Sequence, residues 1–114
     1  MRALTIKQPW AAQIAYGIKK IEYRAWKTDY RGPILITASA GKPPVADGVI
    51  IPTGCTVCVV DLVEITGEQG DYQWHLSKPR PVKPIRVKGK LNLWEHTEPV
   101  EYLPKESHWL QFSP

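Results

Sequence analysis

Prolines and glycines constrain the fold of this chain more than any other feature of its sequence. Eleven prolines and eight glycines are spread over its 114 residues. Proline interrupts helices because it lacks a backbone N–H, and glycine favours turns. The sequence therefore predicts a mainly β fold of short strands with little helix. A chain of this length suits one domain spanning residues 1–114.

The charge balance favours a polyanionic partner. Lysine and arginine number 15 against 11 acidic residues, which leaves a formal net charge of +4. RNA, another nucleic acid or a nucleoside would suit this moderate basic excess. No apolar run is long enough to span a membrane, and residues 1–10 lack the apolar core of a secretory signal. We expect a cytoplasmic monomer with no membrane contact.

Cys55 and Cys58 form a lone C-x-x-C in an apolar stretch. A zinc site would need a second pair of ligands, and a redox pair would normally open a helix. Positions three apart on a strand point to opposite faces, so these thiols do not readily form a disulfide. We expect two structural thiols, with a metal or redox role as the alternative. No metal or cofactor is predicted, because the three histidines are also widely separated.

Local patterns predict the elements. Pro9 favours a helix start, and Gly17 is a natural C-terminal cap, so a short helix is expected over residues 10–16. On the strand predicted for residues 21–26, alternation places Glu22, Arg24 and Trp26 on one face. Further strands are predicted at residues 3–6, 34–39, 57–65, 72–76 and 91–94, with a loop over residues 40–48.

Residues 72–94 concentrate the basic character and contain no acidic side chain. Lysines and arginines there would suit phosphate contacts, which give salt-sensitive affinity without sequence information. A solvated, solubilising surface is the alternative. The expected phosphate contacts are Lys78, Arg80, Lys83, Arg86, Lys88 and Lys90. The extension over residues 96–114 is expected to pack back through Tyr102, Leu103, Trp109 and Phe112.

The octet Gly-Ile-Lys-Lys-Ile-Glu-Tyr-Arg at residues 17–24 resembles the G-x-K-x-x-E-x-R signature of the ASCH family, relatives of PUA, EVE and YTH domains. Residues 6–11 are similar to its opening I-x-Q-P-W-A, and the likeness runs over residues 3–95. The resemblance implies a PUA-like fold, a strongly curved sheet or small barrel with one or two short helices. It also implies a pocket beside the G-x-K turn.

The resemblance further implies binding of RNA or of modified nucleotides, with hydrolysis in some members. One branch removes the acetyl group of N4-acetylcytidine, and ribonuclease activity is described for others. The deacetylating branch carries a threonine three residues after the lysine, where this chain has Glu22. This departure favours binding over catalysis. Two hypotheses remain, a binding module for RNA or a modified nucleobase, and a metal-independent amidohydrolase or ribonuclease.

The resemblance assigns Lys19 and Glu22 to the pocket. If the protein is an enzyme, Lys19 would act as base or nucleophile and Glu22 would shuttle the proton. In a binding module, Glu22 would accept the amine of a base while Arg24 neutralises a phosphate. The alternative from spacing alone is a charged strand face in water, with Glu22 and Arg24 as a surface ion pair.

Aromatic and polar residues complete the predicted ligand set. Trp26 is the preferred stacking residue because it shares strand parity with Glu22 and Arg24, and Trp10 and Trp74 are further candidates. For any one tryptophan, a place in the core is the alternative. Gln8 and Ser39 would contact a ligand at the pocket edge or tie a turn.

Overall fold

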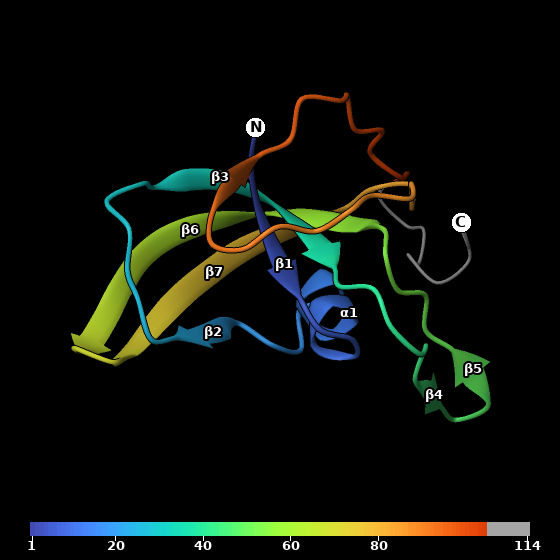
Figure 1. The fold of residues 1–114 in the computed structure, drawn as a ribbon, viewed down its shortest axis with the longest axis horizontal. Helices are drawn as coiled ribbons and strands as arrows, with labels where there is room; N and C mark the ends of the chain where they lie inside the picture. The colour runs from blue at the N-terminus through green and yellow to red at the C-terminus, as the bar shows by residue number, and fades with distance from the viewer. Residues whose placement is uncertain (105–114) are drawn as a thin grey trace.

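A strongly curved six-stranded sheet forms the body of the protein (Figure 1). The computed structural model describes residues 1–104. Strand β1 runs parallel to β3, and the other neighbours in the sheet are antiparallel. This half-barrel confirms the predicted mainly β, PUA-like fold. In the order β2-β7-β6-β3-β1-β8, the strands are Ile21–Arg24, Asp71–Pro81, Thr56–Glu68, Gly32–Ala38, Arg2–Ile6 and Trp94–Glu95.

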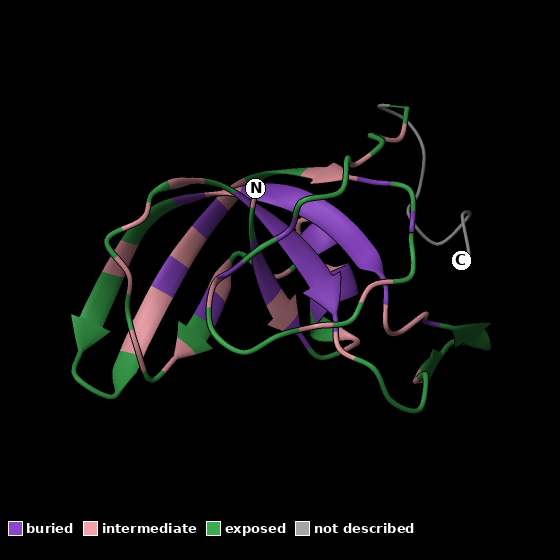
Figure 2. Ribbon diagram, turned by 45° about the horizontal axis from the view of Figure 1, so that its top comes forward, coloured by how far each residue is buried: buried purple, intermediate pink, exposed green. Residues whose placement is uncertain are grey.

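The hydrophobic core lies where β3 pairs with the first half of β6 (Figure 2). Residues 56–60 of β6 are all buried, whereas its far end is exposed where β6 turns into β7. Strands β6 and β7 are 13 and 11 residues long, which is longer than predicted. The extra length arises because the ends of these strands that lie beyond the core pair with each other. Strand β2 pairs with this part of β7 and so extends the sheet away from the core.

Helix α1 (Trp10–Ala15) covers the core beneath the sheet (Figure 1). Four of its six residues are buried, including Ala11 and Ile14. Gly17 follows with a positive φ of 75°, and its N–H donates to the carbonyl of Ile14 at 3.0 Å. Glycine adopts this left-handed conformation without steric cost. The predicted short helix with its glycine cap is therefore confirmed.

Three predicted boundaries are wrong. Strand β2 ends at Arg24, so Trp26 follows the strand instead of sharing its face. The strand expected at residues 91–94 is reduced to Trp94–Glu95, and Leu91 is 89% exposed. The expected loop at residues 40–48 contains β4 (Val45–Ala46), which forms a hairpin with β5 (Val49–Ile50).

Both cysteines are buried and neither forms a disulfide. Burial raises the pKa of Cys55 to about 11 and that of Cys58 further still, so the reactive thiolate is disfavoured at both. Among residues 1–104, no group of three or more histidine, cysteine or acidic side chains is arranged to hold a metal ion. Nor does any helix in that range have the length and apolar character needed to cross a bilayer.

The described part of the extension packs against the end of β7. The N–H of Lys83 donates to the carbonyl of Glu101 at 2.8 Å, and that of Leu103 donates to Pro81 at 3.0 Å. Leu103 also packs against the main core cluster. Trp109 and Phe112 lie outside the described residues.

Candidate functional site

A cleft of about 910 Å³ opens beside the G-x-K-x-x-E-x-R turn. One wall comes from the end of β1 and from Trp10 at the start of α1. A second wall comes from Lys19 and strand β2, and a third from residues 88–92, which precede β8. Ser39 and Ala40, directly after β3, complete the lining, so four segments that are distant in the sequence meet around one concave surface.

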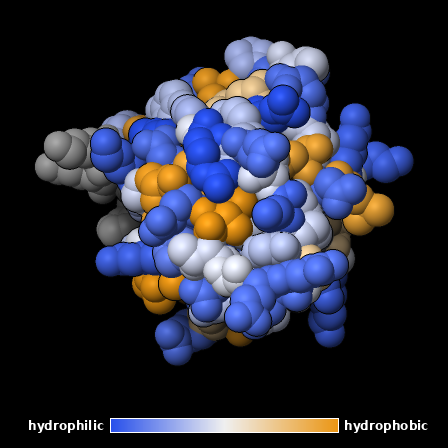
Figure 3. Space-filling model, turned by 90° about the vertical axis from the view of Figure 1, so that its left-hand side faces the viewer, coloured by the Kyte–Doolittle hydropathy of each residue, from blue (hydrophilic) through white to orange (hydrophobic). Residues whose placement is uncertain are grey.

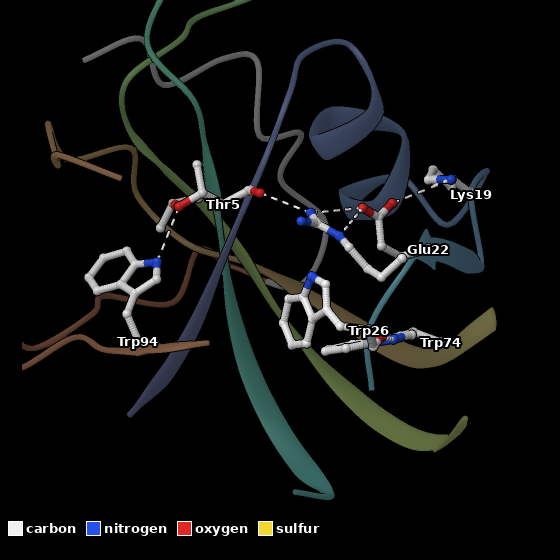
Figure 4. Close-up of polar contacts among 8 residues, drawn as sticks. Thr5, Lys19, Glu22, Trp26, Trp74 and Trp94 are labelled. Atoms are coloured by element: carbon white, nitrogen blue, oxygen red, sulfur yellow. Dashed lines mark hydrogen bonds and ion pairs between the residues drawn. The ribbon is translucent and has the colours of Figure 1, made fainter. Parts of the chain in front are cut away.

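Glu22 and its two cationic neighbours form the charged part of the cleft. Only 8% of Glu22 is exposed. Arg24 donates from Nε to Glu22 Oε2 at 2.9 Å and from Nη2 to the carbonyl of Thr5 at 3.0 Å. Lys19 Nζ lies 3.6 Å from Glu22 Oε1 (Figure 4). The predicted pairing of Glu22 with Arg24 is present, but the carboxylate is buried and not on a solvated face.

The two oxygens of the Glu22 carboxylate differ in their surroundings. Oε2 accepts the hydrogen bond of Arg24, whereas Oε1 has only the longer ion pair with Lys19 and accepts no hydrogen bond from any described residue. At 3.6 Å the ammonium is beyond good hydrogen-bonding distance. Oε1 is therefore a buried, negatively charged acceptor in the cleft with unused hydrogen-bonding capacity.

The hydroxyl of Thr5 joins residues 88–92 to the sheet. It accepts from the Trp94 indole at 3.1 Å (Figure 4). It also accepts from the Lys90 N–H at 3.3 Å and lies 3.1 Å from the Thr37 hydroxyl. A Cβ on Gly89 would lie 2.7 Å from Thr5 Cγ2, closer than side-chain carbons pack. Glycine at this position therefore permits the close approach that holds the third wall of the cleft.

The cleft is strongly basic. Five cationic residues line it against one carboxylate, that of Glu22. Figure 3 shows the surface at the β6–β7 end of the molecule, where separate hydrophobic groups are scattered among hydrophilic ones. The cations of the cleft are Lys7, Lys19, Arg24, Lys88 and Lys90.

The structure brings together only part of the predicted ligand set. Trp10 and Ser39 line the cleft, and Trp10 is 47% exposed. Trp74 is completely buried and offers no ring face to a ligand. Trp26 lies outside the cleft lining and packs edge-on against Trp74, with ring centroids 4.8 Å apart. Gln8 Oε1 accepts from the Ala12 N–H, and Gln8 Nε2 donates to the Pro52 carbonyl. Gln8 therefore ties the first turn of α1 to the segment that precedes β6.

The predicted phosphate contacts divide into two groups. Lys88 and Lys90 line the cleft, and Arg86 borders the hollows beside it. The other three residues lie outside the cleft lining. Of these, Arg80 is engaged by Asp61 at 2.9 Å, and this hydrogen bond raises the pKa of the guanidinium. The other two are Lys78 and Lys83.

Several cleft residues were not predicted, among them Thr5, Lys7, Tyr23 and Asn92. Lys7 occupies the unspecified x position of the stretch similar to I-x-Q-P-W-A, so the motif itself gives no signal for it. Tyr23 occupies the opposite strand parity from Glu22, and the Lys19 ammonium lies 5.2 Å from its ring centroid. Thr5 and Asn92 have no local sequence signal, because their place depends on contacts between distant segments.

Comparison with known proteins identifies the family. The ASCH domain model matches residues 4–111. Human Activating signal cointegrator 1 is 30% identical over 84 residues, and the mouse protein of that name is 27% identical over 84 residues. Each match covers 58% of this chain but only 14% of the relative. ASCH domains are generally thought to bind RNA. The chain belongs to the ASCH domain family.

Proposed function

We propose that the cleft binds a nucleobase, presented by RNA or by a modified nucleoside. The observation that carries this proposal is the Oε1 atom of Glu22, a buried acceptor with unused capacity in a cleft rich in cations. Such an acceptor suits the amino group of a base, while the surrounding cations suit its phosphate. The positive charges of the cleft would attract the ligand, and the Glu22 carboxylate would orient it.

Each residue then has a defined role. Glu22 Oε1 accepts a hydrogen bond from the exocyclic amine of the base, and Arg24 holds the carboxylate in place through Oε2. Lys7 and Lys90 lie on walls of the cleft and are positioned for the phosphate. Trp10 is assigned as the stacking residue, in place of Trp26, because its ring is half exposed and lines the cleft.

Trp10→Ala is expected to weaken binding of a short RNA without unfolding the protein. Stacking of a base on an aromatic side chain contributes about 1–3 kcal/mol, which corresponds to a loss of affinity of about 5- to 150-fold. Fluorescence anisotropy with a labelled RNA of a few nucleotides measures the change. Thermal melting should stay close to that of the wild type, because the ring is only half buried.

Val63→Ala is the matched control for this substitution. Val63 is also an exposed apolar residue but lies outside the cleft lining. Its truncation is expected to leave RNA affinity unchanged. Equal RNA affinity in the Trp10→Ala and wild-type proteins would show that Trp10 is not part of the binding site.

Hydrolysis of an N4-acylated cytosine nucleoside is the second candidate function. It is favoured by one observation, the approach of Lys19 to Glu22 within the cleft at 3.6 Å. In this reaction, water adds to the acyl carbon and the bond to N4 breaks. The acid is released and the amine of cytidine takes up a proton. Glu22 would accept the proton of the attacking water, and Lys19 would stabilise the developing oxyanion.

Incubation of the protein with N4-acetylcytidine, followed by chromatography, tests this candidate. Release of cytidine that is lost in Lys19→Ala and kept in Lys20→Ala would establish hydrolysis. Lys20 is the control because it neighbours Lys19 but does not line the cleft. Absence of cytidine release from the wild type would reject the candidate. A short RNA in a parallel incubation tests for ribonuclease cleavage.

A further inference from the structure

We infer that the cleft is the centre of a longer groove that binds single-stranded RNA across several nucleotides. This inference rests on the proposed function and deepens it, since it selects a polynucleotide strand over a free nucleoside. It is carried by the hollows that adjoin the cleft and by the unpaired cations that border them.

On one side, the cleft continues into a hollow of about 340 Å³. Lys7, Ser39 and Ala40 line both, so the two concave surfaces are contiguous. The hollow extends to Lys42, in the loop that precedes β4. A strand leaving the cleft in this direction would pass two lysines.

On the other side, residues 88–92 separate the cleft from a hollow of about 330 Å³. Lys88 and Lys90 border both surfaces, and Arg86 borders the second hollow. Arg86 also lines a small hollow that shares Ala40 with the cleft. Concave surface therefore lies on both sides of the basic segment over residues 86–90.

The cations along this path are available to a ligand. The five cations that border the cleft and its adjoining hollows are all exposed, and none forms an ion pair within residues 1–104. Arg80, by contrast, is neutralised by Asp61. The second hollow also contains Glu95 and Glu98, and the N-terminal ammonium pairs with Glu95 at 2.7 Å. The five cations are Lys7, Lys42, Arg86, Lys88 and Lys90.

Because Glu22 is buried, the groove would accept single-stranded RNA and not a duplex. A base must insert deeply to reach Oε1, because only 8% of this residue is exposed. A base paired in a duplex has its amino group engaged and its edge covered, so only an unpaired and unstacked base fits. The neighbouring phosphates on its two sides would then contact the cations that flank the cleft.

A length series tests the groove. Cytidine monophosphate and a hexamer of cytidylate are titrated against the protein at several salt concentrations. For a single-stranded ligand, each phosphate contact contributes about −0.7 to the slope of log affinity against log salt concentration. Five contacts therefore give a slope of about −3.5. The hexamer should then lose about 100-fold in affinity between about 50 and 200 mM salt.

Charge variants locate the contacts. The double variant Lys42→Gln, Arg86→Gln should keep three of the five contacts, so the salt slope for the hexamer should fall in magnitude to about −2. Its affinity for cytidine monophosphate should be unchanged. Lys78→Gln with Lys83→Gln removes the same number of charges outside the cleft lining and the adjoining path, and should leave both values unchanged.

The outcomes separate this inference from the proposed function. If the hexamer binds no more tightly than the monophosphate, the groove is overturned while the base-binding cleft stands. A hexamer paired with its complement that binds as tightly as the single strand would also overturn the groove. If neither ligand binds, the proposed function itself fails.

Discussion

Arg24→Gln is expected to lower the free energy of unfolding by about 3 kcal/mol, because it leaves Glu22 as a buried carboxylate without its closest cation. The substitution also removes the hydrogen bond to the Thr5 carbonyl, which ties β2 to β1. Lys19 remains near the carboxylate but only at 3.6 Å. Urea denaturation monitored by circular dichroism measures the loss.

A second ion pair in the protein serves as the control. Arg80 and Asp61 also lie 2.9 Å apart, but both side chains are more exposed than those of Arg24 and Glu22. Arg80→Gln is therefore expected to cost no more than about 1 kcal/mol. Equal losses in the Arg24 and Arg80 variants would show that burial of the Glu22 pair has no energetic consequence. Glu22→Gln combined with Arg24→Gln should recover part of the stability, since no unpaired carboxylate remains.

Trp74→Ala is expected to destabilise the protein by about 3–5 kcal/mol, the usual range for removal of a large aromatic core side chain. Trp74 has no exposed surface, and its indole N–H donates to the carbonyl of Trp26 at 3.2 Å. A domain of this size is stable by only about 5–15 kcal/mol, so the variant would keep little margin. The urea midpoint reports the change.

Trp74→Phe separates ring packing from the indole hydrogen bond. It keeps an aromatic ring in the core and should lose clearly less stability than the alanine variant. RNA affinity of the folded Trp74→Phe protein should match the wild type, because Trp74 does not line the cleft. A specific loss of RNA binding in this variant would contradict the assignment of Trp74 to the core alone.

Local signals in the sequence were sufficient for the scaffold. Pro9 and Gly17 mark the ends of the short helix, and the apolar runs mark the central strands β3 and β6. Such features depend on backbone preferences and on hydrophobic patterning within a few residues. The family signature likewise located Lys19 and Glu22, which do line one cleft.

Local pattern does not indicate which tryptophan lines the cleft. Alternation predicts Trp26 on the same face as Arg24, but β2 ends at Arg24 and Trp26 instead packs against Trp74. Trp10 lies on a helix whose rotation about its axis is decided by packing of Ala11 and Ile14 into the core. The same packing leaves Trp10 half exposed at the cleft.

The third wall of the cleft depends on contacts across most of the chain. Residues 88–92 are held beside the cleft in part by the Thr5 hydroxyl, which accepts hydrogen bonds from Lys90 and Trp94, 85 and 89 positions later in the chain. No periodicity indicates such a contact, and the pattern instead predicted a strand there. The sequence pattern groups the basic residues between positions 78 and 90, but only the fold separates Lys88 and Lys90 from Lys78 and Lys83.

A base that enters the cleft beside Trp10 would change the surroundings of the Trp10 indole, and an NMR titration measures this change directly. A cytidylate trinucleotide is added while the indole N–H resonances of the tryptophans are followed, each assigned with a Trp→Phe variant. The Trp10 resonance is expected to shift saturably, while that of the buried Trp74 stays in place. Saturable binding of the RNA with no shift of the Trp10 resonance would contradict the account.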